Sequence, residues 1–224
     1  AGFSGGRKSI LPGVAGFDTI KIHHSLPIRP YYPAMGIMRG NPFHEISLEV
    51  AQKVGVDFIL NAVQNGEKET ITVVAGDLEH AHEVGVDLCR KNSEIKVKGK
   101  AEIVVTSPGG FPRDINLYQS QKAVSVAERL TKDKGVIILV AECQKGVEKG
   151  NFLEWMLEAK EPKEVIDRFL EEGYSVGSNK AFMLSRALLK NKIIVVTDNI
   201  SEKILNKMFM EKANSLDEAM NTAL

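Results

Sequence analysis

The chain has 224 residues, of which 43% are hydrophobic, enough to bury the core of one large domain or two small ones. Its 29 basic and 29 acidic residues give a formal net charge of zero, so nothing in the composition indicates a nucleic-acid-binding protein. No apolar run approaches the ~20 residues of a membrane-spanning helix. The two cysteines, Cys89 and Cys143, form no CxxC pair, which argues against structural zinc and fits a reducing cytoplasm.

The first 45 residues differ in composition from the rest of the chain. They hold five of the eight prolines and show no sustained period of 2 or 3.6. A long segment without regular structure is usually functional or lies against a partner surface, and its apolar side chains make a solvated tail the less favoured alternative. We expect an irregular Gly/Pro-rich cofactor or interdomain segment over 1–45 and an α/β domain over 46–224. Because the chain starts at Ala1, we expect a fragment of a longer two-domain protein.

The run GGRKSILPG at 5–13, followed by His24, is the first chemically informative stretch. Glycines such as Gly5 and Gly6 let the backbone approach a ligand closely. The amine of Lys8 can bond covalently to an acyl-type carbon, and histidine is the commonest metal ligand. Together these residues suggest a tethered metallocofactor. Taken singly, each is more often an exposed lysine or an ordinary surface imidazole.

From about residue 46, apolar strands alternate with amphipathic helices. Strands are expected at 57–64, 69–75, 101–106, 135–142 and 192–197. Helices are expected at 46–54, 77–91, 115–131, 151–159, 163–172 and 179–189, with a further helix capped by Ser215 and Glu218. Asn65-Gly66 predicts a type I′ turn joining the first two strands as a hairpin. The pattern indicates an α/β fold with a mixed, mostly parallel sheet flanked by helices on both faces.

Two neighbouring segments could bind an anionic ligand. The loop 107–113 joins a strand to a helix, where open α/β sheets bind ligands and a helix N-terminus suits phosphate; the alternative is a tight glycine turn. In the helix that follows, Tyr118, Gln119 and Lys122 share one face. A hydroxyl, an amide and a cation suit an anionic substrate, and the alternative is a solvated helix face.

Other candidate side chains have simpler interpretations. His80 and His82 fall off the apolar stripe of their helix, which favours a charged face over a metal cluster. Trp155 and Met156 lie on a predicted helix and are expected to pack in the core.

Several motifs together resemble the nickel-dependent lactate racemase family. They are GGRKSILPGVAG at 5–16, Thr19-Ile20 with His24, GNPFH at 40–44 and SPGGFPRDINLYQSQK at 107–122. The resemblance covers essentially the whole chain, as the C-terminal portion of a longer family member.

The resemblance implies a nickel-pincer nucleotide, that is, pyridinium-3-thioamide-5-thiocarboxylate mononucleotide, joined to the protein as a thioamide of Lys8. It implies His24 as the imidazole ligand of nickel, with the adjacent His23 as second choice, and the Gly5-Gly6 pair beside the cofactor. Sulfur and imidazole donors suit nickel(II).

The resemblance also implies that Lys122, with Tyr118 and Gln119, lies near the carboxylate of the substrate. The implied isomerase reaction is racemisation or epimerisation of a 2-hydroxyacid of the lactate type, by reversible hydride transfer to the cofactor. In the family, the acid–base histidines and a substrate-binding arginine lie upstream of the matched segment. We therefore expect this chain alone to be inactive and to lack bound cofactor. We expect its partner to be the missing N-terminal domain, and a homo-oligomer is a further possibility. The alternative is a nucleotide- or phosphate-binding α/β module without redox activity.

Overall fold

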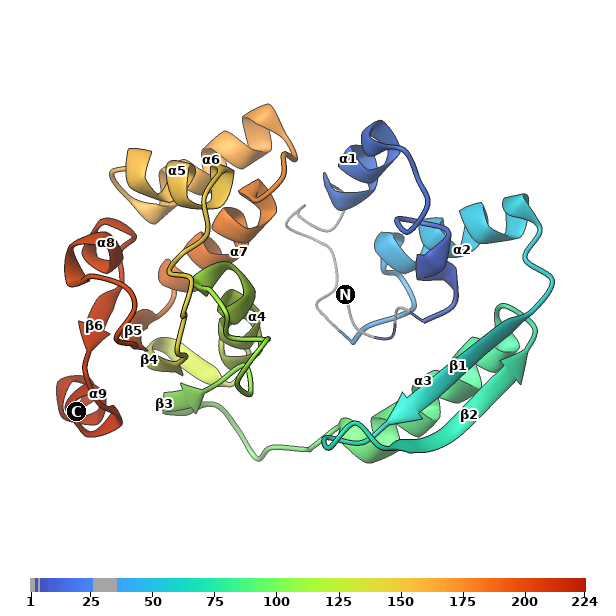
Figure 1. The fold of residues 1–224 in the computed structure, drawn as a ribbon, viewed down its shortest axis with the longest axis horizontal. Coiled ribbons are helices and arrows are strands. Elements are labelled where there is room, and N and C mark those ends of the chain that lie inside the picture. The colour runs from blue at the N-terminus through green and yellow to red at the C-terminus, as the bar shows by residue number, and fades with distance from the viewer. Residues whose placement is uncertain (1–2, 4, 26–35) are drawn as a thin grey trace. The chain divides into compact units, whose positions relative to one another are not determined.

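The computed structural model describes residues 3, 5–25 and 36–224, which form two compact units within 1–96 and 97–224 (Figure 1). This division differs from the boundary at 45/46 suggested by composition, because Ile10 of the N-terminal segment packs on a core cluster formed by residues 51–81. Among the described residues, no helix combines the length and apolar character needed to cross a lipid bilayer. Three prolines of the expected irregular segment, Pro27, Pro30 and Pro33, lie outside the described residues.

The first unit contains a short 3-10 helix, three α-helices and a hairpin among its described residues. Its elements are η1 (Arg7–Ser9), α1 (Phe17–Ser25), α2 (Pro42–Val54), β1 (Ile59–Gln64), β2 (Thr70–Gly76) and α3 (His80–Ser93). Helix α1 lies inside the segment expected to be irregular. It was missed because His23 is its only buried residue, so its sequence carries no apolar stripe.

The core of the first unit joins the N-terminal loop to α2, β1 and α3. Its buried residues are Ala51, Ile59, Leu78 and Ala81, with Ile10, Leu48 and Val56 packed against them. Leu11, next to Ile10, is also fully buried. The N-terminal loop is therefore anchored by its own apolar side chains.

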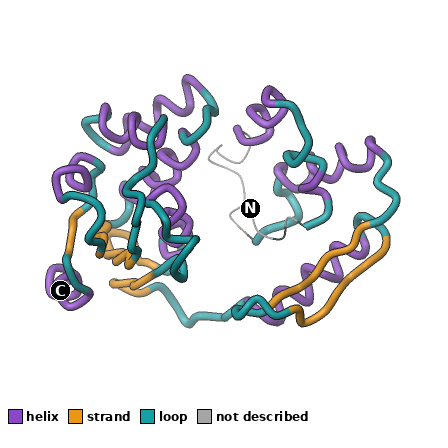
Figure 2. The backbone as a smooth tube through the Cα atoms, in the orientation of Figure 1, coloured by secondary structure: helices purple, strands orange, loops and turns teal. Residues whose placement is uncertain are grey.

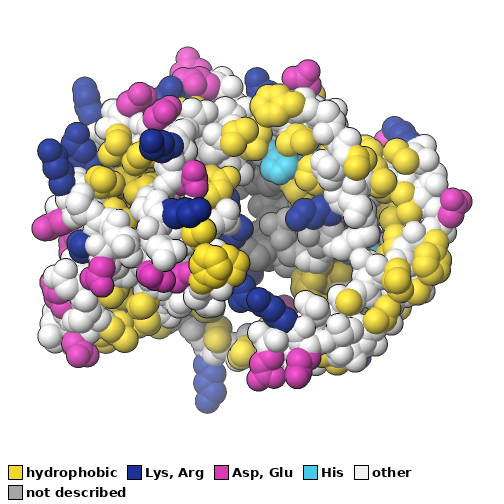
Figure 3. Space-filling model, in the orientation of Figure 1, with side chains coloured by type: hydrophobic (Ala, Val, Ile, Leu, Met, Phe, Trp, Pro, Cys, Tyr) yellow, Lys and Arg dark blue, Asp and Glu magenta, His cyan; other side chains and the backbone are white. Residues whose placement is uncertain are grey.

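Strands β1 and β2 form the predicted antiparallel hairpin as a separate two-stranded sheet. The predicted type I′ turn is wrong: the left-handed residue is Lys68, with φ of 68°, and not Gly66. The Asn65 side chain instead accepts hydrogen bonds from the backbone N–H groups of Glu67 and Glu69, which shapes a longer loop. Hydrophobic side chains lie exposed along this hairpin (Figure 3).

The second unit is an α/β domain with a four-stranded sheet of order β3-β4-β5-β6 (Figure 2). Its elements are β3 (Ala101–Thr106), α4 (Leu117–Ala127), β4 (Thr131–Val140), α5 (Asn151–Glu158), α6 (Pro162–Glu172), α7 (Ser178–Leu188), β5 (Lys192–Val196), α8 (Glu202–Lys207), β6 (Glu211–Ala213) and α9 (Leu216–Ala223). All its strand pairs are parallel, so the expected mixed character comes only from the separate hairpin.

Helices cover both faces of the parallel sheet, as predicted. On one face the paired residues Ile138 and Ile194 pack with Ala219 of α9. Their neighbours Ile137 and Ile193 point to the opposite face, where α4 packs on β3 and β4 and α7 packs on α4. Of the predicted caps, Ser215 is confirmed, because its hydroxyl accepts the backbone N–H of Glu218.

Candidate functional site

Lys8 lies on η1, an exposed position on a loop that is otherwise firmly held. Its neighbours Arg7 and Leu11 are buried, at 5% and 1% exposed. The backbone carbonyl of Lys8 accepts a hydrogen bond from the N–H of Gly13 at 2.9 Å. The loop therefore presents a lysine amine on a backbone with little freedom to move.

Gly5 and Gly6 pack closely against strand β1. A Cβ atom at Gly5 would lie 3.2 Å from the Asn61 side chain, and one at Gly6 would lie 3.3 Å from Ile59. Gly6 also has a φ of 68°, which side chains rarely adopt. Within the described residues, the two glycines let the loop backbone lie close to β1. Their position beside a cofactor stays a prediction.

A buried polar network that the sequence did not predict holds the residue before Lys8. Arg7 Nη2 donates to His82 Nδ1 at 3.1 Å, and His82 Nε2 donates to the carbonyl of Phe3 at 2.7 Å. Burial lowers the pKa of Arg7, although the charges of Glu79 and Glu83 act to raise it. Burial, with the Arg7 charge adding to it, lowers the pKa of His82, so a neutral ring links the loop to α3.

The predicted charged helix face is confirmed for His80 and wrong for His82. His80 is exposed and its ring lies 3.0 Å from the Asp77 carboxylate. His82 is only 4% exposed, because it turns toward the N-terminal loop. The core positions predicted for Trp155 and Met156 are confirmed, at 4% and 0% exposed.

His23 joins α1 to α2. It is 1% exposed, and its Nε2 lies 2.9 Å from the Ser47 hydroxyl and 3.2 Å from the Phe43 carbonyl. The rings of His23 and Phe43 pack with centroids 4.0 Å apart. These contacts give His23 a packing role and leave its ring little access to a ligand.

His24 is half-buried, and a backbone carbonyl sets the tautomer of its ring. Its Nδ1 lies 3.0 Å from the carbonyl of Ile20, which can only accept, so Nδ1 carries the proton and the lone pair is on Nε2. Metal-binding histidines are commonly oriented by this kind of hydrogen bond. Burial lowers the pKa of His24, and the Lys8 ammonium lowers it further. Near pH 7 the ring is therefore neutral.

In the second unit, Tyr118, Gln119 and Lys122 lie on α4 as expected, and their role in binding an anion stays a prediction. Asn116 caps α4 by accepting the backbone N–H of Gln119 at 2.9 Å. The ammonium of Lys122 is exposed and donates to Gln119 Oε1 at 2.6 Å. The Tyr118 ring is half-buried against Phe152, with centroids 5.7 Å apart, and burial raises the pKa of its hydroxyl.

Lys180, on α7, joins this group and was missed from the sequence. Its Nζ lies 5.9 Å from the centroid of the Tyr118 ring and 3.5 Å from Gln121 Oε1. Burial, reinforced by the charge of Lys122, lowers the pKa of Lys180 to about 8. No local pattern marks this lysine, because its neighbours come from another helix.

The loop 107–113 forms a tight turn with its two glycines at positive φ. The first amides of the following helix are already paired: Leu117 donates to Gly146, Tyr118 to Val147 and Gln119 to Asn116. A cavity of about 280 Å³ beside the loop has acidic side chains in its lining, including Asp114, Glu142 and Asp198. Paired amides and carboxylates do not suit phosphate, so the geometry favours the turn over an anion site here.

Comparison with known proteins agrees with this architecture. The sequence model of the lactate racemase C-terminal domain matches residues 95–224, and that of the lactate racemase N-terminal domain matches residues 1–35. The chain belongs to the lactate racemase family. The match to the family's C-terminal domain begins close to the start of the second compact unit.

Individual relatives match along the whole chain. A lactate racemase from Thermoanaerobacterium thermosaccharolyticum is 38% identical and one from Lactiplantibacillus plantarum is 34% identical; both matches cover 100% of this chain and 53% of the relative. The chain thus spans about half the length of these curated relatives.

Solved structures show the same fold. The apoprotein structure of the Thermoanaerobacterium thermosaccharolyticum lactate racemase superposes with a TM-score of 0.93 at 38% identity, over 98% of this chain and 54% of that one. A crystal structure of a Thermotoga maritima protein shares the fold at 17% identity, with a TM-score of 0.68 over 94% of this chain and 56% of that one.

Proposed function

We propose that this chain is the C-terminal, cofactor-anchoring part of an enzyme that racemises or epimerises a 2-hydroxyacid of the lactate type. Its family membership and the two lactate racemases that match along its whole length support this function. The chain covers about half of those relatives, so the acid–base groups would come from the other half. The isolated chain is then inactive.

The residues at the N-terminal loop fit a lysine-tethered nickel-pincer nucleotide. Lys8 offers an exposed amine on an anchored backbone, as a thioamide link requires. Among the described residues, no group of three His, Cys, Asp or Glu side chains is placed to hold a metal by itself. One imidazole from His24 with sulfur and carbon donors from the cofactor is a donor set suited to nickel(II). When bound, this group supplies a reversible hydride acceptor.

In this proposal the chain's own residues hold and orient the reactants. His24 Nε2 offers its lone pair to the metal while the Ile20 carbonyl fixes the ring. Lys122 binds the substrate carboxylate, with its ammonium aimed by Gln119, and the Tyr118 hydroxyl adds a donor. The observation that carries the proposal is the exposed amine of Lys8 on an anchored backbone, in the same compact unit as His24, whose ring is oriented by the Ile20 carbonyl.

Intact-protein mass spectrometry tests the proposal. The full-length protein, co-expressed with the cofactor-making enzymes, should carry a nickel-sensitive adduct on Lys8 and racemise lactate. Lys8→Ala should lose the adduct and the activity, whereas Lys21→Ala, an exposed lysine on α1, should keep both. His24→Ala should keep the adduct and lose nickel. An unmodified Lys8, with Lys8→Ala fully active, would exclude the proposed role.

A further inference from the structure

Lys180, near the start of α7, lies against α4 beside Tyr118 and Gln121, the residues four before and one before Lys122. Lys122 and Lys180 are close enough for the charge of one to lower the pKa of the other, and Lys180 lies over the Tyr118 ring. Each ammonium has a neutral amide oxygen as its hydrogen-bond acceptor, Gln119 for Lys122 at 2.6 Å and Gln121 for Lys180 at 3.5 Å. The amides orient the two ammonium groups without neutralising them.

Within residues 97–224, neither ammonium forms an ion pair with a carboxylate. Burial raises the pKa of Tyr118 and the charge of Glu148 adds to this effect, and the Glu148 carboxylate accepts a hydrogen bond from Asn116 and not from either lysine. Two cations of like charge, one of them half-buried, destabilise the folded chain, and a bound anion would relieve that cost.

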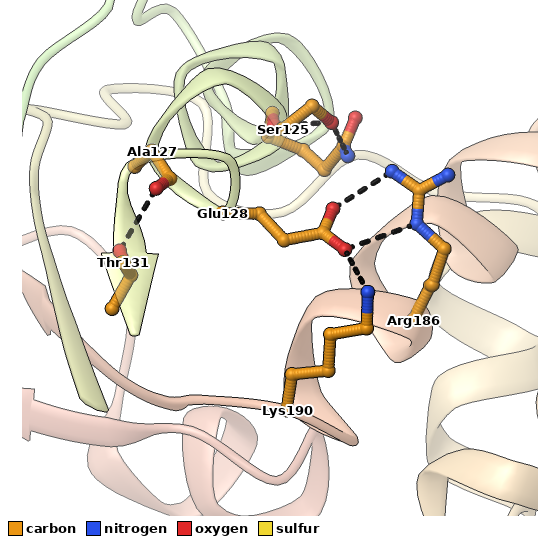
Figure 4. Close-up of polar contacts among 7 residues, drawn as sticks. Ser125, Ala127, Glu128, Thr131, Arg186 and Lys190 are labelled. Carbon is orange, nitrogen blue, oxygen red and sulfur yellow. Dashed lines mark hydrogen bonds and ion pairs between the residues drawn. The ribbon is translucent and has the colours of Figure 1, made fainter. Parts of the chain in front are cut away.

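The opposite ends of the same two helices show the contrast (Figure 4). There the Glu128 carboxylate, 5% exposed, accepts from Arg186 at 2.7 and 3.2 Å, and Lys190 lies 3.5 Å away. At this end, where α4 and α7 only pack together, the positive charges are balanced by a buried carboxylate. At the Lys122–Lys180 end, residues 97–224 supply no such counter-charge.

We propose that Lys180 and Lys122 together form a two-lysine site for one anionic group of the reactants. The site takes either the carboxylate of the 2-hydroxyacid or the phosphate of the tethered nucleotide, since both are compact oxyanions that accept from two ammonium groups. This inference deepens the proposed function and rests on it for the identity of the anion. It adds Lys180, on a second helix, to the residues that bind the reactants.

Anion titration of the 224-residue chain tests the site directly. Inorganic phosphate and L-lactate are titrated separately against the isotopically labelled chain, and NMR shifts of the α4 and α7 amides report binding. Wild type should bind at least one probe. Lys180→Met should weaken binding about tenfold or more, the loss expected for one charged contact, and Lys180→Arg should restore it. Lys203→Met, an exposed lysine on α8, is the matched control and should bind as wild type.

The loaded full-length enzyme distinguishes the two anions. If the site takes the carboxylate, Lys180→Met should raise KM for the hydroxyacid with the Lys8 adduct intact. If it takes the phosphate, the same change should reduce the yield of adduct. The proposal is overturned if the wild-type chain binds neither probe, or if Lys180→Met binds both as tightly as wild type. A missing Lys8 adduct in the unmutated enzyme would count against the proposed function and leave the titration result standing.

Discussion

Gly6→Ala tests how the backbone around Lys8 is held. Gly6 precedes η1 with φ of 68° and ψ of −89°, a combination strained for residues with a side chain. The added methyl would also lie 3.3 Å from two carbons of Ile59, a core residue of the first unit. Gly5→Ala provides a matched control, because its φ is outside the left-handed region and the three atoms nearest to its Cβ would belong to the movable amide of Asn61.

The structure gives a magnitude for each change. Backbone strain at Gly6 costs about 1–3 kcal/mol, and crowding against buried Ile59 adds about 1 kcal/mol, so Gly6→Ala should destabilise the first unit by about 2–4 kcal/mol. Gly5→Ala should cost less than about 1 kcal/mol, because the Asn61 side chain can rotate away.

Hydrogen–deuterium exchange of the 224-residue chain can measure the difference. Amides of β1 should exchange about 30-fold faster or more in Gly6→Ala, and within a few-fold of wild type in Gly5→Ala. Amides of β5, in the other unit, serve as the internal reference and should not change. Equal protection of β1 in the two variants would refute the reasoning, because it would mean that the φ of Gly6 constrains nothing.

Three further predictions follow from buried polar groups. His23→Ala should destabilise the first unit by about 1–3 kcal/mol in the same exchange assay, because it removes a buried ring and its hydrogen bonds, and His24→Ala should cost less because that ring is partly exposed. Acidification below about pH 6.5 should destabilise the first unit, because burial lowers the folded-state pKa of His82 and the unfolded chain binds the extra proton. His82 contributes at most about 1.4 kcal/mol per pH unit to the slope, and His82→Gln should remove that contribution and leave those of His23 and His24. Lys180→Met should stabilise the second unit of the ligand-free chain by about 1–3 kcal/mol at pH 7, measured by urea denaturation monitored at the single tryptophan. Glu128→Gln should destabilise the same unit. A loss of stability in Lys180→Met would show that the charge of Lys180 is already compensated.

The parallel sheet could be predicted from sequence because its strands are continuous apolar runs. The expected strand 101–106 coincides with β3, and the expected strand 192–197 differs from β5 by one residue. The strand β6 and the helix α8 were missed because three and six residues are too short to show a period. In the hairpin, Asn65-Gly66 indicated the strand pairing, but the turn type depended on the Asn65 side chain.

The candidate site was only partly accessible to sequence reasoning. Lys8, His24 and the Tyr118–Lys122 face belong to motifs that are local in the chain, so their residue types and spacing could be recognised. Arg7, His82 and Lys180 acquire their environments from segments far away in sequence, which no local pattern encodes. The interpretation of His82 failed for this reason, because its off-stripe position meant contact with another segment and not with solvent.

Fold stability alone does not account for Lys180. A methionine of similar length would fill the same space over Tyr118 without the cost of burying a charge beside Lys122. At the other end of the same two helices, the buried carboxylate of Glu128 is balanced by two cations, Arg186 and Lys190. The fold can therefore balance a buried charge where the two helices only pack together. An uncompensated ammonium is expected where the compensating charge arrives with a ligand, since binding sites are commonly built at the expense of the stability of the empty protein. On this reasoning, replacing Lys180 by an apolar residue raises the free energy of unfolding of the ligand-free chain, and the same replacement weakens binding of the proposed anion.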